Sequence, residues 1–351
     1  MNSVRSRLAS NGPDSLYQKN RIKSISFLIV LAVLLLITVL LSLCSGSYET
    51  PIGELIKGIF GMSSDRKINL IVQNNRLPRI LTALLADGGL GLAGCVLQAI
   101  LRNPLASSST LGVSQGATFG AAFAIVVLNL SGVSDIGIPL CAFVGSIAVA
   151  LVILGLSKFR QVSPEGIVLA GVAISSMFTG ATTLLQYFAN EVQLSTLVVW
   201  TFGDLGSTGW QDLGGMAVMV ALLCIYCMIH RWDYNALLSG EETAISLGVN
   251  VKRLTLVGMI MCCLCSSVVV SNVGLISFIG LVAPHIVRMV VGNNHVYLIP
   301  GSILGGATLL LLGDLFARTV ISPVILPIGA ITSFLGGPLF LYLLFKGGKK
   351  Q

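Results

Sequence analysis

Charged residues are scarce in this sequence. Only 10% of the 351 residues are Asp, Glu, Lys or Arg, whereas 54% are hydrophobic. A soluble globular domain contains about 25% charged residues, so the composition excludes that class and predicts an all-α integral membrane protein in a lipid bilayer. The formal charge of +7 does not indicate nucleic-acid binding, because the basic residues lie mostly at the ends of apolar runs, where they act as topology signals.

Recognisable catalytic and metal-binding patterns are also missing. The sequence has no G-x-x-x-x-G-K-[ST] phosphate loop, and its 3 histidines are scattered. The 8 cysteines all fall in or beside apolar runs, and Cys224-x-x-Cys227 has no second pair at zinc-like spacing. We therefore expect no enzyme activity, no metal site and no cofactor in this chain.

Long apolar runs are abundant, and about 20 residues suffice to cross a bilayer. We predict ten transmembrane helices within a permease domain at residues 27–346, flanked by cytoplasmic tails at 1–26 and 347–351. The predicted spans are 27–43, 80–100, 112–130, 136–156, 165–189, 213–230, 254–273, 275–292, 298–316 and 325–345. The division between the seventh and eighth spans is expected near Asn272–Gly274.

The basic residues are distributed unequally between the two sides that these spans define. Fifteen lie on one side and six on the other, which together make up the 21 Lys and Arg. Because cytoplasmic loops are enriched in Lys and Arg, the richer side is predicted to be cytoplasmic. That side includes both termini, in agreement with an even number of spans.

Glycine and proline predict the packing of the spans. Glycines three or four residues apart share one helix face and let a neighbouring backbone approach closely. Such glycines occur in three spans: Gly88, Gly91 and Gly94; Gly112, Gly116 and Gly120; and Gly301 and Gly305. Ser163-Pro164 predicts a capped start of the fifth span, and Pro284 predicts a kink or an unwound segment in the eighth.

A polar island at residues 237–249 interrupts the apolar sequence. Ser239 and Glu242 have the spacing of a capping box, and Gly248 is placed to end a helix. About two turns of helix are too short to be stable alone in water. This segment therefore needs a surface, which could belong to this chain or to a partner.

Few charged residues fall near membrane depth. Asp87 is a candidate for contact with a transported substrate, although a carboxylate at the end of a span is an alternative interpretation. Arg76, Arg79 and Arg318 are predicted on the outer side. They either snorkel at the ends of spans or form a positive patch for an acidic partner.

Several motifs, taken in order, identify a family. They are Arg76-Leu-Pro-Arg79, Gly91-Leu-Ala-Gly-Cys-Val-Leu-Gln98, Arg102-Asn-Pro-Leu-Ala106, Leu111-Gly-Val-Ser-Gln-Gly-Ala117, Gly240-Glu-Glu-Thr-Ala-Ile-Ser-Leu-Gly248, Phe278-Ile-Gly-Leu-Val-Ala-Pro-His-Ile-Val-Arg288 and Leu326-Pro-Ile-Gly329. From about residue 27 to 346, the chain resembles the permease subunits of type II ABC importers for ferric siderophores, haem and cobalamin, the vitamin B12-permease-like family.

This resemblance implies an importer in a bacterial or archaeal cytoplasmic membrane. Two permease subunits, expected to be identical, would enclose the path at a two-fold axis. Two partner ATPase subunits would bind ATP and Mg on the cytoplasmic side, and a substrate-binding protein would dock outside. The cargo expected first is a ferric siderophore, with haem or cobalamin next.

The resemblance also implies roles for individual residues. Arg76, Arg79 and Arg318 would meet acidic residues of the binding protein. Asn103 and Leu105 would belong to the cytoplasmic gate, and the fifth span, at residues 166–186, would line the path. The coupling helix, at about 239–248, would contact the ATPase through Ser239, Gly240, Glu241, Glu242, Ala244, Leu247 and Gly248. Asp87 and Gln186 are the candidate pathway residues.

The sequence departs from the family pattern at three places. Ile325 stands where relatives often have Glu, Pro164-Glu165 replaces small hydroxyl residues at the gate, and Asp87 replaces a small or apolar residue. These departures leave the substrate open, as does the choice between a homodimer and a heterodimer with a paralogous permease. The alternative function, an ion-coupled secondary transporter, would need buried acidic or His residues, which this sequence largely lacks.

Overall fold

The computed structural model describes residues 13–46, 48, 50–130, 136–158, 163–322 and 324–347, and all regular structure in these ranges is helical. The helices are α2 Pro13–Cys44, α3 Ile52–Ile59, α4 Arg66–Ile71, η1 Val72–Arg76, α5 Leu77–Ile100, α6 Val113–Val126, α7 Gly137–Lys158, α8 Pro164–Phe188, α9 Glu191–Phe202, α10 Trp210–Ile229, α11 Arg231–Leu238, α12 Glu241–Ser246, α13 Val251–Val273, α14 Ile279–Val291, α15 His295–Thr319 and α16 Ile328–Gly347.

Each predicted span coincides with one of these helices. Seven helices of the described chain are long and apolar enough to cross a membrane, and α6, α14 and the described part of α16 are shorter apolar helices. A polytopic all-α membrane fold is therefore established, while ten crossings remain a prediction. Helix α2 begins at Pro13, well before the predicted start at residue 27, so residues 13–26 continue the first helix. Residues 1–12 and 348–351 lie outside the described ranges.

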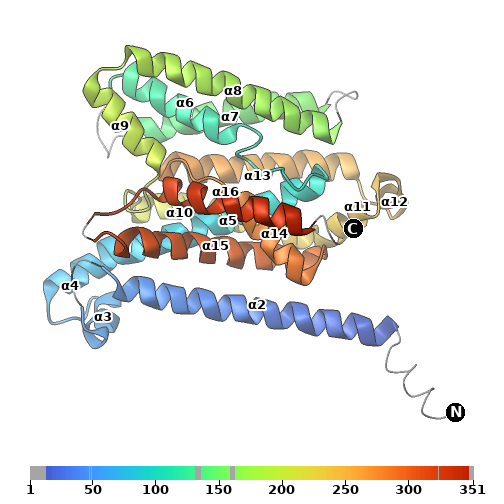
Figure 1. The fold of residues 1–351 in the computed structure, drawn as a ribbon, viewed down its shortest axis with the longest axis horizontal. Helices are drawn as coiled ribbons and strands as arrows, with labels where there is room; N and C mark the ends of the chain where they lie inside the picture. Colours follow the sequence, from blue (N-terminus) through green and yellow to red (C-terminus); the bar gives the residue numbers. More distant parts are fainter. Residues whose placement is uncertain are drawn as a thin grey trace, which may run out of the picture.

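Helix α5 is the centre of the bundle, and most of its length is buried. It packs against α10, α13, α14 and α15. Helices α6, α7 and α8 form a layer on one side of these central helices, and α2 lies on the opposite side (Figure 1). Helices α11 and α12 are at one end of the bundle and α3 and α4 at the other (Figure 1). We call these the α12 end and the α4 end.

The seventh and eighth predicted spans separate where expected. Gly274 adopts a positive φ of 80° and ends α13, and the chain stays non-helical up to Phe278. Helix α14 then continues through Pro284 without interruption. The unwound segment therefore precedes the proline rather than surrounding it. Because Pro284 has no N–H, the carbonyl of Gly280 lacks its usual helical donor, and Gly94 of α5 packs directly against that oxygen.

The predicted glycine contacts are confirmed in part. Cβ atoms on Gly116 and Gly145 would overlap the backbone carbonyl of the other residue, so α6 and α7 touch backbone to backbone. Gly112 differs, since it caps α6 with a φ of +86° and faces α8. Gly301 and Gly305 contact the side chain of Val287 on α14.

Side-chain caps set several helix starts. Ser163 accepts a hydrogen bond from the backbone N–H of Gly166, which confirms the predicted start of α8. Helix α9 was not predicted, although Asn190 and Gln193 form a full capping box at its start. The 12 residues of α9 are too few to give a spanning signal, so the hydropathy pattern missed it.

Candidate docking and coupling sites

An arginine cluster lies at the α4 end of the bundle. It consists of Arg76 and Arg79 at the start of α5, Arg318 at the end of α15, and the carboxylates of Asp204 and Asp314. Asp314 is fully buried. Its Oδ1 accepts a hydrogen bond from Arg79 Nε at 2.9 Å and lies 2.8 Å from Arg79 Nη2. Its Oδ2 accepts from Arg318 Nε at 2.9 Å, so one carboxylate serves two guanidinium groups.

The other arginine donors tie the end of α2 to this cluster. Arg318 donates to the Oγ of Ser42 at 2.6 Å and to the carbonyl of Ser45 at 3.1 Å. Arg76 donates to the carbonyls of Leu43 and Tyr48, both at 2.6 Å. The cluster therefore joins three helices, α2, α5 and α15, at one end of the molecule.

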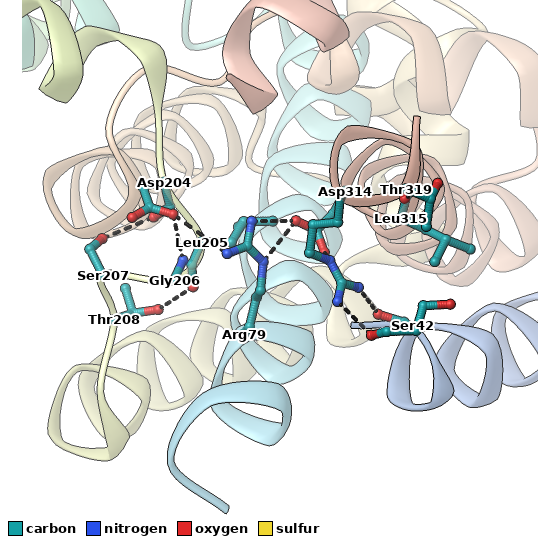
Figure 2. Close-up of polar contacts among 12 residues, drawn as sticks. Ser42, Arg79, Asp204, Leu205, Gly206, Ser207, Thr208, Asp314, Leu315 and Thr319 are labelled. Atoms are coloured by element: carbon teal, nitrogen blue, oxygen red, sulfur yellow. Dashed lines mark hydrogen bonds and ion pairs between the residues drawn. The ribbon is translucent and has the colours of Figure 1, made fainter. Parts of the chain in front are cut away.

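Asp204 is the more exposed carboxylate of the cluster. Figure 2 shows the Arg79 side chain between Asp204 and Asp314. Arg79 Nη1 lies 3.8 Å from Asp204 Oδ1, and the Asp204 side chain is 54% exposed. The same Oδ1 accepts from the backbone N–H of Gly206 at 2.7 Å. Asp204 thus stabilises a turn between α9 and α10 and faces solvent beside the arginines.

Two of the three candidate docking arginines are buried rather than exposed. Arg76 is 5% exposed and Arg79 8% exposed, and their guanidinium groups bond to internal partners. A buried guanidinium needs a counter-charge and acceptors to offset the loss of hydration. The four-residue spacing of Asp314 and Arg318 was visible in the sequence, but Arg79 is 235 residues from Asp314. No local pattern could have paired those two.

The polar island forms α12 at the opposite end, with a start that differs from the prediction. The capping box is wrong: Ser239 closes α11, and the N-cap of α12 is Gly240, with no side-chain hydrogen bond. Gly240 has a φ of +107°, which favours glycine at this position. Gly248 ends the segment with a φ of +85°, as predicted.

One side of α12 packs on its own chain, and the other is exposed. Leu237 and Ala244 are buried in a small cluster with Val251 of α13. Ile245 and Leu247 are exposed, Leu247 by 67%. This chain therefore supplies the surface for the inner face of α12. The outer face is exposed, and on it Glu241 forms an ion pair with Arg102.

Helix α11 is held firmly beside α12. The Oδ1 of Asn235 accepts from the backbone N–H of His295 at 2.7 Å, and its Nδ2 donates to Asn294 Oδ1 at 2.9 Å. Both partners are at the start of α15, whose far end carries Asp314 and Arg318. The two ends of the bundle are thus connected through one 25-residue helix.

The predicted gate residues lie in a turn between α5 and α6, next to α12. Asn103 Oδ1 accepts from the backbone N–H of Leu105 at 2.9 Å, and Thr110 Oγ1 donates to the Leu105 carbonyl at 3.0 Å. Arg102 Nη2 donates to Glu241 Oε2 at 3.1 Å. The structure therefore brings the candidate gate and the candidate coupling helix together, although Arg102 and Glu241 are 139 residues apart.

The candidate pathway residues are separated. Asp87 is fully buried inside α5, and its carboxylate oxygens have no hydrogen-bond partner among the described residues. Asp87 is therefore enclosed by the neighbouring helices and does not lie at the end of α5. Gln186 is half-buried near the end of α8. Within the described ranges, no group of three or more His, Cys, Asp or Glu side chains is arranged to hold a metal.

Comparison with known proteins shows the family. The profile of the FecCD transport family matches residues 34–346. An ABC transporter permease protein of Methanocaldococcus jannaschii is 48% identical and aligns over 93% of this chain and 96% of its own. A hemin transport system permease of Yersinia pestis is 34% identical over 91% and 96% of the two chains. A vitamin B12 import system permease of Escherichia coli is 35% identical over 95% and 99%.

A solved structure agrees with these relatives. A metal-chelate type ABC transporter in an inward-facing conformation superposes with a TM-score of 0.80 at 32% identity, covering 92% of this chain and 99% of that one. The sequence match and the shared fold both extend over almost the whole chain. This protein therefore belongs to the FecCD transport family of ABC transporter permeases.

Proposed function

We propose that this chain is the membrane-spanning permease of a binding-protein-dependent importer that moves a metal chelate across the cytoplasmic membrane. A ferric siderophore is the first candidate, followed by haem and cobalamin. The similar proteins are named as transporters of the metal-chelate type, of hemin and of vitamin B12. ATP would be hydrolysed in a partner subunit. The observation that carries the proposal is α12, a short helix whose outer face is exposed at one end of a membrane bundle.

The outer face of α12 suits a protein groove. It combines the exposed apolar side chains of Ile245 and Leu247 with the carboxylates of Glu241 and Glu242. Amphipathic helices dock into grooves through such mixed faces. In this proposal Ser239 closes the preceding helix α11, Gly240 and Gly248 set the ends of the α12 segment, and Ala244 anchors its buried face. The exposed residues contact the ATPase.

The arginine cluster marks the end where the binding protein would dock. Three guanidinium groups face two carboxylates there, which leaves one positive charge unbalanced. An uncompensated positive potential attracts acidic partners and fixes their register. Because Arg76 and Arg79 are buried, we assign them to shaping this surface and its positive potential rather than to direct contact with the partner. Ile325 adds an exposed apolar side chain rather than a carboxylate.

Helix α8 carries a polar stripe that supports a path between two permease copies. Ser176, Thr179, Thr183 and Gln186 follow each other at spacings of three, four and three residues, so they share one face. Ser176, Thr179 and Thr183 are exposed in the single chain. The hydroxyls of Ser176 and Thr183 donate to carbonyls of their own helix. Polar side chains in transmembrane helices usually face the bundle interior or a water-filled cavity, and we therefore assign the stripe to a path shared with a second copy.

Transport assays test the proposed function. Proteoliposomes containing this permease, its ATPase and its binding protein should accumulate one chelate in an ATP-dependent manner. Ferric hydroxamate siderophore, haemin and cobalamin would be offered separately as radiolabelled probes. Uptake driven by a proton or sodium gradient in the absence of the ATPase would contradict the proposal and favour a secondary transporter.

Reversing the charge of the α12 face should uncouple the importer. Glu241→Lys combined with Glu242→Lys is expected to abolish both transport and the stimulation of ATP hydrolysis by the loaded binding protein, since like charges at a docking surface are repulsive. Thermal unfolding should change little, because both side chains are exposed. The matched control is Glu191→Lys, an exposed charge reversal at the start of α9. Normal coupling in the double variant would rule out α12 as the ATPase contact.

A further inference from the structure

A cavity of about 300 Å³ lies between α10 and α13 at the α12 end of the bundle. The end of α10 contributes Tyr226 and His230 to its walls, and α13 contributes Arg253 and Val257. Small-molecule sites occupy about 300–1,000 Å³, so the cavity can hold a group of moderate size. None of these side chains has a role in the docking, coupling or path assignments above.

The neighbours of the cavity indicate its depth in the membrane. Helix α10 is long and apolar enough to cross a bilayer, and its Leu222, Ile225 and Ile229 side chains are 49%, 57% and 68% exposed. Trp232 at the start of α11 is 59% exposed, and tryptophan is enriched where a bilayer meets water. The lining residue His230 lies between Ile229 and Trp232, which places the cavity at the level of lipid headgroups.

Arg253 gives the cavity an unbalanced positive charge. Asp233 is its acidic lining residue, and Oδ2 of this carboxylate accepts a hydrogen bond from Nδ1 of His230 at 2.6 Å. Arg253 is exposed, and its guanidinium group forms no hydrogen bond or ion pair within the described ranges. Asp233 therefore already has a partner, whereas the guanidinium group of Arg253 is available to an anion.

The start of α13 adds to this positive charge. Asn250 caps the helix, since its Oδ1 accepts from the backbone N–H of Arg253 at 3.1 Å, and Lys252 and Arg253 both belong to the first turn. The N-terminus of a helix carries partial positive charge, so basic residues are unfavourable there and anions are favourable. A bound anion would offset the helix end and both side chains together.

We propose that this cavity binds an anionic phospholipid from the leaflet at the α12 end. The phosphate would pair with Arg253, and an acyl chain would pass along Tyr226, Val257 and the exposed face of α10. Basic pockets between transmembrane helices bind the headgroups of acidic lipids. The site requires only the membrane fold of this family, so it does not depend on which chelate is transported.

Native mass spectrometry of the full-length permease in detergent tests this site. Dioleoyl phosphatidylglycerol and dioleoyl phosphatidylcholine, which share their chains and differ in charge, would be titrated separately. The wild type should bind one phosphatidylglycerol per chain in preference to phosphatidylcholine. Arg253→Gln should weaken phosphatidylglycerol binding about fivefold, which corresponds to about 1 kcal/mol for one basic residue near an anionic membrane surface. Its binding of phosphatidylcholine should not change.

Two further variants separate charge from shape. Lys23→Gln removes an exposed charge from α2 at the same end of the bundle but outside the cavity (Figure 1), and it should bind phosphatidylglycerol like the wild type. Val257→Phe narrows the cavity without changing its charge and should weaken binding. Thermal unfolding of Arg253→Gln without added lipid should match the wild type, because the side chain is exposed.

Four outcomes would overturn the proposal. The first is equal phosphatidylglycerol affinity in the wild type and Arg253→Gln. The second is an equal loss in Lys23→Gln and Arg253→Gln, which would indicate attraction to the whole surface. Displacement of the lipid by an equal concentration of glycerol 3-phosphate would assign the cavity to a soluble anion. Phosphatidylglycerol binding that disappears when the permease is purified with its partner subunits would assign it to a protein contact.

Discussion

Asp314→Ala is expected to destabilise the permease by about 3–5 kcal/mol, because removing one member of a buried ion pair leaves uncompensated charge behind. The loss should be large here, since the Asp314 carboxylate is fully buried and bonds to both Arg79 and Arg318. Thermal unfolding of the protein in detergent would measure the effect. The packing of α2 should weaken as well, because Arg318 also holds Ser42 and Ser45.

Asp204→Asn is the control within the same cluster. It keeps an oxygen that can accept the hydrogen bond from Gly206 and removes an exposed charge 3.8 Å from Arg79. We expect a change of less than about 1 kcal/mol, as for exposed ion pairs. If Asp314→Ala unfolded at the same temperature as Asp204→Asn, the buried cluster would not be a stabilising element.

Gly94→Ala is the second substitution expected to have a large effect. A Cβ on Gly94 would overlap the carbonyl oxygen and carbon of Gly280. Both obstructing atoms belong to the backbone, so a rotamer change cannot relieve the overlap and α5 must move away from α14. Overpacking a tight core usually costs about 1–3 kcal/mol, and we expect this variant at or above the upper value, with a lower yield of folded protein.

Gly155→Ala provides the comparison. A Cβ on Gly155 of α7 would meet nothing within 4 Å. Alanine is favoured over glycine in a helix by about 0.8–1 kcal/mol, so this variant should be as stable as the wild type or slightly more stable. Unfolding temperatures of the two variants measured side by side would decide. Equal behaviour would show that α5 and α14 are not in backbone contact.

Local features were predicted well because a few neighbouring residues determine them. Ser163 caps α8, Gly248 ends the α12 segment, and the irregular chain after Gly274 separates α13 from α14. The clearest local error concerns α12. Ser239 has the residue type of a cap, yet the positive φ of Gly240 moves the cap by one position. Competing local signals one residue apart could not be ranked from the sequence.

The sequence by itself determined the membrane class, the positions of the apolar helices and, through ordered motifs, the resemblance to the family. These properties depend on composition and on patterns within a few turns of helix. Only the tertiary structure decided that Arg76 and Arg79 are buried and that other helices enclose Asp87. It also decided that Arg102 forms an ion pair with Glu241. Hydropathy shows that a helix will be in the membrane, but helix packing decides which side chains meet. That packing depends on backbone contacts such as Gly94 with Gly280, between residues far apart in the chain.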